Sequence, residues 1–497
     1  MYTENESVRL ILGLKVKSLR QQKNLSYHQL ADATGLSLSY LHDIETGKKY
    51  PKADKILALS KAFGVEYDYL VSLRSNKKLQ PFIDLISSDF LNVVPWEHFG
   101  LSPAILLELF SNTPDKVTAF ISTLLKISRS YQMSKESFYN AALRSYQDLY
   151  DNYFEDLETA VKECRRQFHG GDQLPLSVEW IEESLNKQFG ITVNRKKLSG
   201  IPDLQRIRSF YSKKQKVFFI NKKLNTAQEK FILGRELAFQ FLDLQERPYE
   251  TMIQKSHSFD QLLNNFKASY FAVSLMIPEE ELVDDLKKLI NLRVWDEKAW
   301  LQTILKYDAT PEMFMQRLTN IFPKHFGIES LFFLRMSGDL PKDKFEMTKE
   351  IHLSQMHTPY ANELQEHYCR RWVSVKIMKE ANALEEKKKF RHPIIRAQIS
   401  EYWQTHNRYF CISVVKPRLN VDEPFVSVTV GILMDHKLAQ RFQFLNDPTI
   451  VVRTVNTTCE RCSIPDCLER AVPPIAIIKE EQLRKTEHAL KMLDEMK

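Results

Sequence analysis

The apolar positions between residues 8 and 75 recur at helical spacing and predict five short helices separated by turns. Ser26 and Ser37 precede the second and third of these helices, where a serine hydroxyl caps a helix N-terminus. Gly35 lies between them and favours a tight turn. The apolar residues around the third helix are assigned to a small core: Leu36, Leu41 and Ile44. The other residues form an outward face that can enter a DNA major groove: Ser37, Leu38, Ser39, Tyr40, His42 and Asp43.

This pattern resembles the phage-repressor or XRE type of helix-turn-helix domain, which we assign to residues 1–78. The resemblance implies double-stranded DNA as a partner and a homodimer or higher homo-oligomer, because one such module binds weakly. It also implies a structural ion pair between Arg20 and Glu45. The base-reading positions hold Leu38, Ser39 and Asp43, with His42 adjacent. The residues expected to meet the phosphate backbone are Tyr27, Lys48 and Lys49. A helical unit that binds protein and not DNA is the alternative.

Residues 79–171 are predicted to form a helical linker or dimerisation region. Pro95, Pro103 and Pro114 mark breaks, and residues 137–168 carry apolar side chains at helical spacing. Aromatic residues recur through this run, but the aspartate and glutamate residues between them oppose phosphate. We therefore expect the aromatic side chains to pack in a core or between subunits.

Residues 172–302 predict short strands followed by a helix, and they resemble the ImmA/IrrE metallopeptidase-like domain. In that family the helix bears the zinc-binding motif HExxH, and a later helix gives a third ligand. Here the motif reads RELAF at residues 235–239, which leaves only Glu236, the residue that would be the general base. Lys267 stands at the position of the acidic third ligand, where a cation cannot bind zinc. We interpret the segment as a peptidase scaffold without its catalytic residues, used for packing or to enclose a ligand. The chain is not expected to be an enzyme.

Residues 303–474 alternate between predicted strands and helices. The β-rich segments are 328–341, 406–418 and 424–435, whereas residues 347–372 predict a helix. An α+β sensor domain of GAF or PAS type fits this pattern, although such a fold does not name its ligand. Residues 475–497 predict one charged helix. The predicted fold class is therefore mainly α with an α+β sensor region.

Three of the six cysteines cluster near the end of the chain, where Cys459, Cys462 and Cys467 follow CxxC and then x4-C spacing. A CxxC turn lets two thiolates converge on one ion, and a third thiol can complete one face of a zinc or iron-sulfur site. Three ligands are one short of a full set. The thiols available for the fourth position are Cys369, Cys411 and Cys164. Free cysteines that simply pack in a core are the alternative.

Length and composition set the scale of the fold. A chain of 497 residues, 43% of them hydrophobic, is expected to form three or four domains. No segment resembles a transmembrane span or a secretory signal, so we expect a cytoplasmic protein without a membrane partner. In a reducing cytosol, clustered cysteines indicate metal or redox chemistry more often than disulfides. A net charge of +7 permits nucleic-acid binding without establishing it.

The order of these parts resembles the family of short-chain acyl-CoA-responsive regulators that includes PrpR and RamB. The resemblance combines the XRE domain, FAVSLMIP at residues 271–278, LFFLRMSGDLPK at residues 331–342 and the terminal cysteine motif. It implies a DNA-binding transcriptional regulator that senses a short-chain acyl-CoA in its C-terminal half and holds a [4Fe-4S] cluster. The residues of the acyl-CoA pocket are not assigned by it.

The same resemblance implies that Cys459, Cys462 and Cys467 are cluster ligands. It favours Cys369 as the fourth, because HYCRRW occupies the family's Cys-x-x-Trp position, with Cys411 as the second choice. Zinc is the alternative metal, since thiolates accommodate either. Alternative functions are a zinc-stabilised DNA-binding repressor without a metabolite response, or a hydrolase on the peptidase-like scaffold.

Overall fold

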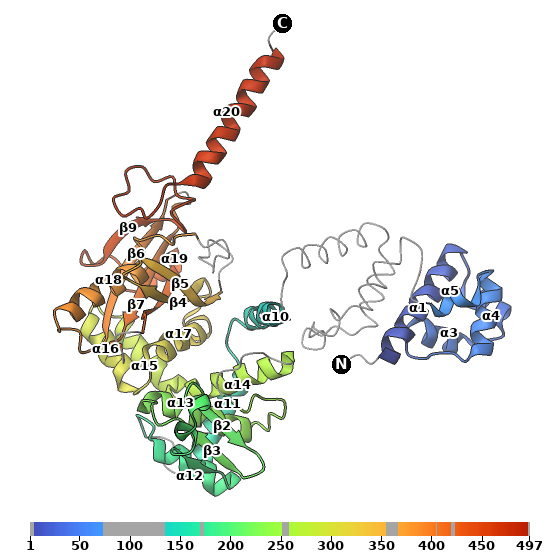
Figure 1. Ribbon diagram of the computed structural model, residues 1–497, viewed down its shortest axis with the longest axis horizontal. Coiled ribbons are helices and arrows are strands. Elements are labelled where there is room, and N and C mark those ends of the chain that lie inside the picture. Colours follow the sequence, from blue (N-terminus) through green and yellow to red (C-terminus); the bar gives the residue numbers. More distant parts are fainter. Residues whose placement is uncertain are drawn as a thin grey trace. The chain divides into compact units, whose positions relative to one another are not determined.

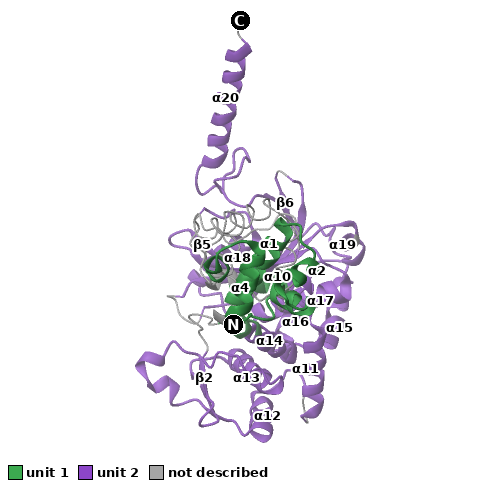
Figure 2. Cartoon of the chain, turned by 90° about the vertical axis from the view of Figure 1, so that its right-hand side faces the viewer, with its two compact units in different colours: residues 1–146, 254–263 green, residues 147–253, 264–497 purple. Residues whose placement is uncertain are grey.

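The computed structural model describes residues 4–72, 135–168, 173–250, 258–353, 366–403, 405–418 and 423–495. The chain divides into two compact units, which Figure 2 colours separately. The first comprises Met1–Tyr146 and Gln254–Leu263, and the second comprises Gln147–Ile253 and Asn264–Lys497. Residues 79–134, the larger part of the predicted linker, lie outside the described residues.

Five short helices form the described N-terminal segment, as the apolar spacing predicts. They are α1 (Glu4–Gln22), α2 (Tyr27–Thr34), α3 (Leu38–Glu45), α4 (Ala53–Phe63) and α5 (Tyr67–Val71). The predicted caps are present, because the Ser26 and Ser37 hydroxyls accept hydrogen bonds from the backbone N–H groups of Gln29 and Tyr40 at 3.2 and 3.3 Å. Gly35 ends α2 in the left-handed conformation, with φ of 70°. Local sequence signals therefore fix both ends of the turn between α2 and α3.

A small apolar core holds these helices together. Its members are Leu12, Val16, Leu19, Leu30, Leu41, Ile44, Ile56, Leu59, Phe63 and Leu70. Helix α1 approaches α3 closely at Gly13, where a Cβ atom would lie 2.4 Å from the carbonyl oxygen of Ile44. Only glycine permits this approach, which seats the inner side of α3 on the core and leaves its outer side exposed.

The second unit contains a three-stranded sheet covered by helices. Its elements are α11 (Glu155–Gln167), α12 (Val178–Phe189), β1 (Thr192–Asn194), the 3-10 turns η2 (Leu198–Gly200) and η3 (Pro202–Leu204), β2 (Ser209–Ser212), β3 (Val217–Ile220) and α13 (Thr226–Phe241). The strand order is β1-β3-β2, with β1 parallel and β2 antiparallel to β3. The core buries Leu233, Leu237 and Ala238 of α13 completely. Helix α14 (Phe259–Met276) adds Phe271 and Leu275 to it.

The predicted helical run over residues 137–168 is interrupted in the structure. Helix α10 (Lys135–Leu149) ends before α11 begins, and Asp151 and Asn152 between them have positive φ values of 50° and 53°. A run of left-handed residues cannot continue a right-handed helix. Val161 and Cys164 of α11 lie in the core around α13. That core therefore extends into the segment that the sequence assigned to the linker.

A six-stranded sheet forms the rest of the second unit, with helices on both faces (Figure 1). Its strands are β4 (Leu331–Asp339), β5 (Lys344–His352), β6 (Ile394–Tyr402), β7 (Arg408–Val415), β8 (Phe425–Leu433) and β9 (Val451–Val455). The helices are α15 (Glu279–Ile290), α16 (Glu297–Lys306), α17 (Pro311–Phe326), α18 (Val373–Glu386), α19 (His436–Arg441) and α20 (Ile475–Glu495). The order is β5-β4-β8-β7-β6-β9, and only the β6–β9 pair is parallel.

The two faces of this sheet carry different apolar cores. Phe333 and Phe410 lie in the core shared with α15, α16 and α17. Their chain neighbours Phe332 and Cys411 lie in the core shared with α18, as strand alternation requires. The mixed helix-and-sheet character agrees with the predicted α+β region, whereas its GAF or PAS type stays a prediction.

One helix predicted in this region is wrong at both of its ends, and its residues 354–365 lie outside the described residues. The sequence predicts a helix over residues 347–372, but β5 covers residues 344–352, and residues 366–372 form a bridge and turns. Phe345 and Ile351 of β5 are buried, and β5 pairs with β4 along its whole length. Pairing and burial outweigh the helix propensity of the glutamate and lysine residues in this segment.

The charged C-terminal helix is confirmed over Ile475–Glu495. Among the described helices, none combines the length and apolar character needed to cross a bilayer.

Candidate functional site

Backbone pairing brings the predicted fourth cysteine to the terminal cysteine motif. Tyr368 forms an isolated antiparallel bridge with Thr458. On either side of it, the backbone N–H of Cys369 donates to the carbonyl oxygen of Thr457 at 3.0 Å, and the N–H of Cys459 donates to that of His367 at 2.8 Å. The segment before α18 is thereby fixed against the segment after β9, although the two are far apart in the chain.

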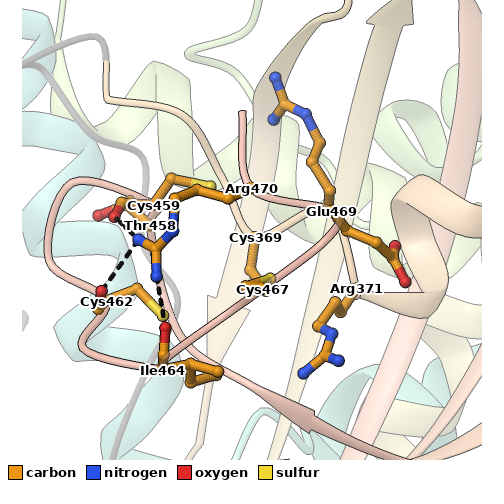
Figure 3. A pocket seen from close by; sticks show the side chains of 10 residues that line it. Cys369, Arg371, Thr458, Cys459, Cys462, Ile464, Cys467, Glu469 and Arg470 are labelled. Atoms are coloured by element: carbon orange, nitrogen blue, oxygen red, sulfur yellow. Dashed lines mark hydrogen bonds between the residues drawn. The ribbon is translucent and has the colours of Figure 1, made fainter. Parts of the chain in front are cut away.

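The four predicted metal ligands line one small cavity (Figure 3). They are Cys369, Cys459, Cys462 and Cys467. All but Cys467 are buried, and all six cysteines of the chain are free thiols. Burial raises the pKa of the Cys369 thiol to about 11, against smaller opposing contributions from backbone hydrogen bonds. The structure therefore brings together the residues that the sequence grouped.

The other two cysteines lie elsewhere. Cys411 is on β7, buried, with its Sγ 3.7 Å from the carbonyl oxygen of Tyr409, and it is not part of the cavity lining. Burial raises the pKa of the Cys411 thiol to about 12. Cys164 lies in the core around α13. Both have the setting of packed core thiols.

Arg470 stabilises the cysteine loop from within, a role that sequence reasoning missed. Its guanidinium donates to the carbonyl oxygens of Cys459 at 3.2 Å, Cys462 at 3.0 Å and Ile464 at 2.6 Å (Figure 3). The backbone N–H of Ala471 lies 3.4 Å from the Cys459 sulfur and donates to it. An arginine three residues after the last cysteine is the only signal that the sequence contains for this arrangement.

Ion pairs and hydrogen bonds surround the loop. The Glu366 carboxylate accepts from the Arg461 guanidinium at 2.8 Å and from the Thr458 hydroxyl at 2.7 Å. Despite burial, which alone would raise it, these bonds lower the pKa of Glu366. The indole N–H of Trp372 donates to the carbonyl oxygen of Asn456 at 2.9 Å. The two segments that carry the cysteines are thus tied by side chains as well as by backbone.

The four cysteines supply the sulfur donors that both zinc and iron accept. Four thiols face one cavity, and an N–H donor to sulfur favours the thiolate form that binds metal. As the thiols lie, no three His, Cys, Asp or Glu side chains of the described residues are grouped closely enough for one metal ion. A single zinc ion, with Zn–S bonds of about 2.3 Å, would require the thiols to draw together.

A second candidate site is the outer face of α3. Ser37, Leu38, Ser39 and His42 are exposed, whereas Tyr40 and Asp43 are half-buried. Lys48 and Lys49 follow the helix and are exposed. The Lys49 ammonium lies 2.9 Å from the Asp43 carboxylate, and this hydrogen bond lowers the pKa of Asp43. The predicted contact residues therefore border one surface around α3.

The predicted ion pair between Arg20 and Glu45 is confirmed, at 2.6 Å for Nε and 2.9 Å for Nη2. Tyr27 joins it, because its hydroxyl donates to Glu45 at 2.7 Å and its ring lies 4.1 Å below the Arg20 guanidinium. Burial, followed by the bond to Glu45, raises the pKa of Tyr27 to about 12. A phosphate contact by Tyr27 stays a prediction, and it requires the phenol to share or leave this partner.

The peptidase-like helix carries a different chemistry from a zinc site. Arg235 and Phe239 occupy the positions of the two motif histidines, and neither side chain binds zinc. Glu236 is buried and forms a two-pronged ion pair with Arg247, one bond being 2.9 Å. Arg235 donates to the side-chain oxygen of Asn265. The remaining carboxylate is thus held by a cation.

Residues 16–70 match the family model described as helix-turn-helix. A stretch of 61 residues is 39% identical to the control protein C.BamHI of Bacillus amyloliquefaciens, covering 12% of this chain and 75% of that protein. The chain belongs to the helix-turn-helix family through this domain.

Residues 186–317 match a second family model, the IrrE N-terminal-like domain. The HTH-type transcriptional regulator RamB of Mycobacterium tuberculosis is 22% identical over 295 residues, which cover 55% of this chain and 58% of RamB. The chain therefore matches little more than half the length of that relative. A solved structure described as a Mycobacterium tuberculosis transcriptional regulator is 20% identical, covers 67% of this chain and 94% of that one, and superposes with a TM-score of 0.45.

Proposed function

We propose that this protein is a transcriptional regulator that binds duplex DNA through its helix-turn-helix domain and responds to a short-chain acyl-CoA through its second unit. The observation that carries DNA binding is the exposed outer side of α3 on a helix-turn-helix scaffold. In such domains the recognition helix enters the major groove.

The chemistry of this surface divides into base and backbone contacts. Ser39 and His42 can form hydrogen bonds with base edges, and the exposed Leu38 can contact a thymine methyl group. Lys48 supplies positive charge for phosphate. One domain of this size gives modest affinity, so two copies of the chain on paired half-sites complete the proposal.

Selection from random duplex DNA tests this step, because it finds the operator sequence and the binding activity together. The full chain should enrich a motif with two related half-sites. On the selected duplex, Ser39→Ala should weaken binding by about 1 kcal/mol, roughly fivefold, through loss of one base contact. Ser18→Ala, on α1, is the matched control and should bind like the wild type. No enriched motif would refute sequence-specific DNA binding.

The cysteine site is proposed to hold a [4Fe-4S] cluster through Cys369, Cys459, Cys462 and Cys467. Four thiols around one cavity and the N–H donor to Cys459 support this assignment. When bound, the cluster would crosslink the segment before α18 to the segment after β9. By donating to the carbonyl oxygens of Cys459 and Cys462, Arg470 would keep the backbone of the ligand loop in position around the cluster.

The effector is proposed to be a short-chain acyl-CoA, as the resemblance of the sequence motifs to the acyl-CoA-responsive family implies. The similarity to RamB over 295 residues supports a transcriptional regulator. Gating requires that the acyl-CoA bind one arrangement of the second unit better than another. Fluorescence anisotropy on the selected duplex, titrated with acetyl-CoA, propionyl-CoA and free CoA, measures this coupling. A shift in DNA affinity with an acyl-CoA and not with free CoA supports the proposal, and no shift with any of them contradicts it.

A further inference from the structure

A second cavity, of about 510 Å³, lies within the second unit between the peptidase-like helices and the six-stranded sheet. Its walls come from α13, α14 and α17 on one side. On the other side they come from β4, β5, β8 and residues 416–418, 423 and 424. Its volume is in the range of small-molecule sites. It is separate from the cysteine cavity, with which it shares no lining residue.

Positive charge dominates the lining of this cavity. Six arginine or lysine residues line it, against the two carboxylates of Glu312 and Glu423. The Arg335 guanidinium forms an ion pair with the Glu312 carboxylate at 3.2 Å, and the Lys349 ammonium lies 3.6 Å from the same carboxylate. Arg418 pairs with Glu385, which is not part of the lining. Glu312 is shared between Arg335 and Lys349, so the lining still carries an excess of positive charge.

Arg235 is the most deeply buried of these cations. The residue is 9% exposed, and its Nε has no hydrogen-bond partner among the described residues. The bond to Asn265 is made through Nη2 and supplies no negative charge. Desolvation, reinforced by the nearby Arg247, lowers the pKa of Arg235 to about 10. A buried guanidinium without its own carboxylate is unfavourable unless a ligand completes its partners.

Two lysines on the sheet side line the same cavity, and both are half-buried. Desolvation lowers the pKa of Lys349 on β5 and of Lys416 after β7, with Glu312 as the largest opposing influence on each. Lys349 donates to the side-chain oxygen of Gln316 at 2.7 Å. Both walls of the cavity therefore present cations, and the lysines of the sheet side are less buried than Arg235.

We propose that this cavity binds a small organic anion bearing phosphate, with Arg235 from the peptidase-like helix and Lys349 from the sheet as its anion-binding residues. Arginine pairs with phosphate through two parallel hydrogen bonds, and lysine supplies a point charge. Phe231, Val273 and Met313 line the same cavity and accept an apolar portion of the ligand. In identifying this anion with the acyl-CoA effector, the inference rests on the proposed function. Arg235 thus binds an anion at the position where the peptidase family has a histidine that binds zinc.

Calorimetric titration of the full chain, purified without air, tests this assignment with propionyl-CoA, free CoA and inorganic pyrophosphate as probes. Arg235→Gln and Lys349→Gln should each weaken propionyl-CoA binding about tenfold or more. Arg484→Gln, an exposed α20 cation outside the cavity, is the control and should leave the affinity unchanged. Lys349 is on an edge strand, so its variant gives the answer if Arg235→Gln fails to fold.

The outcomes separate this inference from the proposed effector. Unchanged propionyl-CoA affinity in both variants overturns the cavity assignment and leaves the acyl-CoA response standing. Pyrophosphate binding that depends on Arg235, without binding of any CoA compound, supports the cavity and overturns the effector. Absence of binding for all three probes to the wild-type chain overturns both.

Discussion

Arg470 donates its guanidinium N–H to the carbonyl oxygen of Cys462 at 3.0 Å, from a position after the last cysteine of the motif. The same side chain reaches the carbonyls of Cys459 and Ile464. One cation therefore satisfies three carbonyl groups of a loop that has no regular secondary structure. The cysteine spacing alone does not specify the loop, because the backbone between the thiols depends on this residue.

Replacing Arg470 should loosen the cysteine loop. Arg470→Gln removes most of the donors to three carbonyls, and we expect a local loss of about 2–3 kcal/mol, since hydrogen bonds that involve a charged group contribute more than neutral ones. Hydrogen exchange over residues 459–470 measures this loss. Arg484→Gln, on the exposed face of α20, should leave the exchange unchanged. Equal protection in wild type and Arg470→Gln would contradict the stabilising role.

Removing only one partner of the ion pair between Arg20 and Glu45 should destabilise the helix-turn-helix domain more than removing both. Arg20→Met leaves the Glu45 carboxylate buried and should cost about 3–5 kcal/mol. Hydrogen exchange of residues 10–72 in the full chain reports the loss. The double variant Arg20→Met with Glu45→Met is the control and should recover much of the stability, because it leaves no unpaired charge. A single variant as protected as the wild type would show that the pair is dispensable.

Lys48 should contribute to DNA affinity through charge and not through sequence. Lys48→Gln should weaken binding to selected and unrelated duplexes alike, and it should reduce the slope of log affinity against log salt by about 1. Anisotropy at several salt concentrations measures the slope. Lys61→Gln, exposed on α4 outside the predicted contact set, should leave the slope unchanged. An unaltered slope for Lys48→Gln would remove this residue from the interface.

The lowered pKa of Glu279 should make the stability of the second unit depend on acid pH. Burial alone would raise its pKa, but hydrogen bonds from Tyr153, Lys162 and His325 outweigh it and lower the pKa from 4.5 to about 2. A carboxyl with a lowered folded-state pKa contributes stability that is present above the unfolded pKa. That stability is lost as the pH falls through the folded pKa. The contribution should therefore fade between pH 4.5 and about 2.

Urea unfolding followed by tryptophan fluorescence across this pH range tests the assignment. Glu279→Gln should be less stable than wild type at neutral pH and should lose less stability on acidification. Glu155→Gln, at an exposed carboxylate on α11, provides the control and should follow the wild-type curve. Parallel curves for wild type and Glu279→Gln would show that this carboxyl has an ordinary pKa.

The sequence was most informative where structure is local. The caps at Ser26 and Ser37 and the left-handed Gly35 depend on a few neighbouring residues, so their pattern could be read directly. The ion pair between Arg20 and Glu45 came from a family resemblance that covers the whole domain. The bond from Tyr27 to Glu45 was missed because the resemblance assigned Tyr27 to phosphate.

Elements that depend on distant partners were harder to predict. Strand β5 has a helix-like composition and is a strand because β4 lies beside it. The break at Asp151 and Asn152 depends on left-handed backbone that spacing of apolar residues does not signal. The convergence of Cys369 with the terminal motif was predicted from a family position, and in the structure it depends on the bridge from Tyr368 to Thr458. The cavity lined by Arg235 and Lys349 is formed by residues from several elements that are distant in the sequence, so no short sequence pattern predicts it.

The most direct measurement is the iron, acid-labile sulfide and zinc content per chain of protein purified without air, for wild type and for Cys369→Ser and Cys411→Ser. A [4Fe-4S] cluster predicts about four iron and about four sulfide per chain, retained in Cys411→Ser and lost or labile in Cys369→Ser. One zinc per chain without sulfide, or a cluster that depends on Cys411 and not on Cys369, would contradict the account.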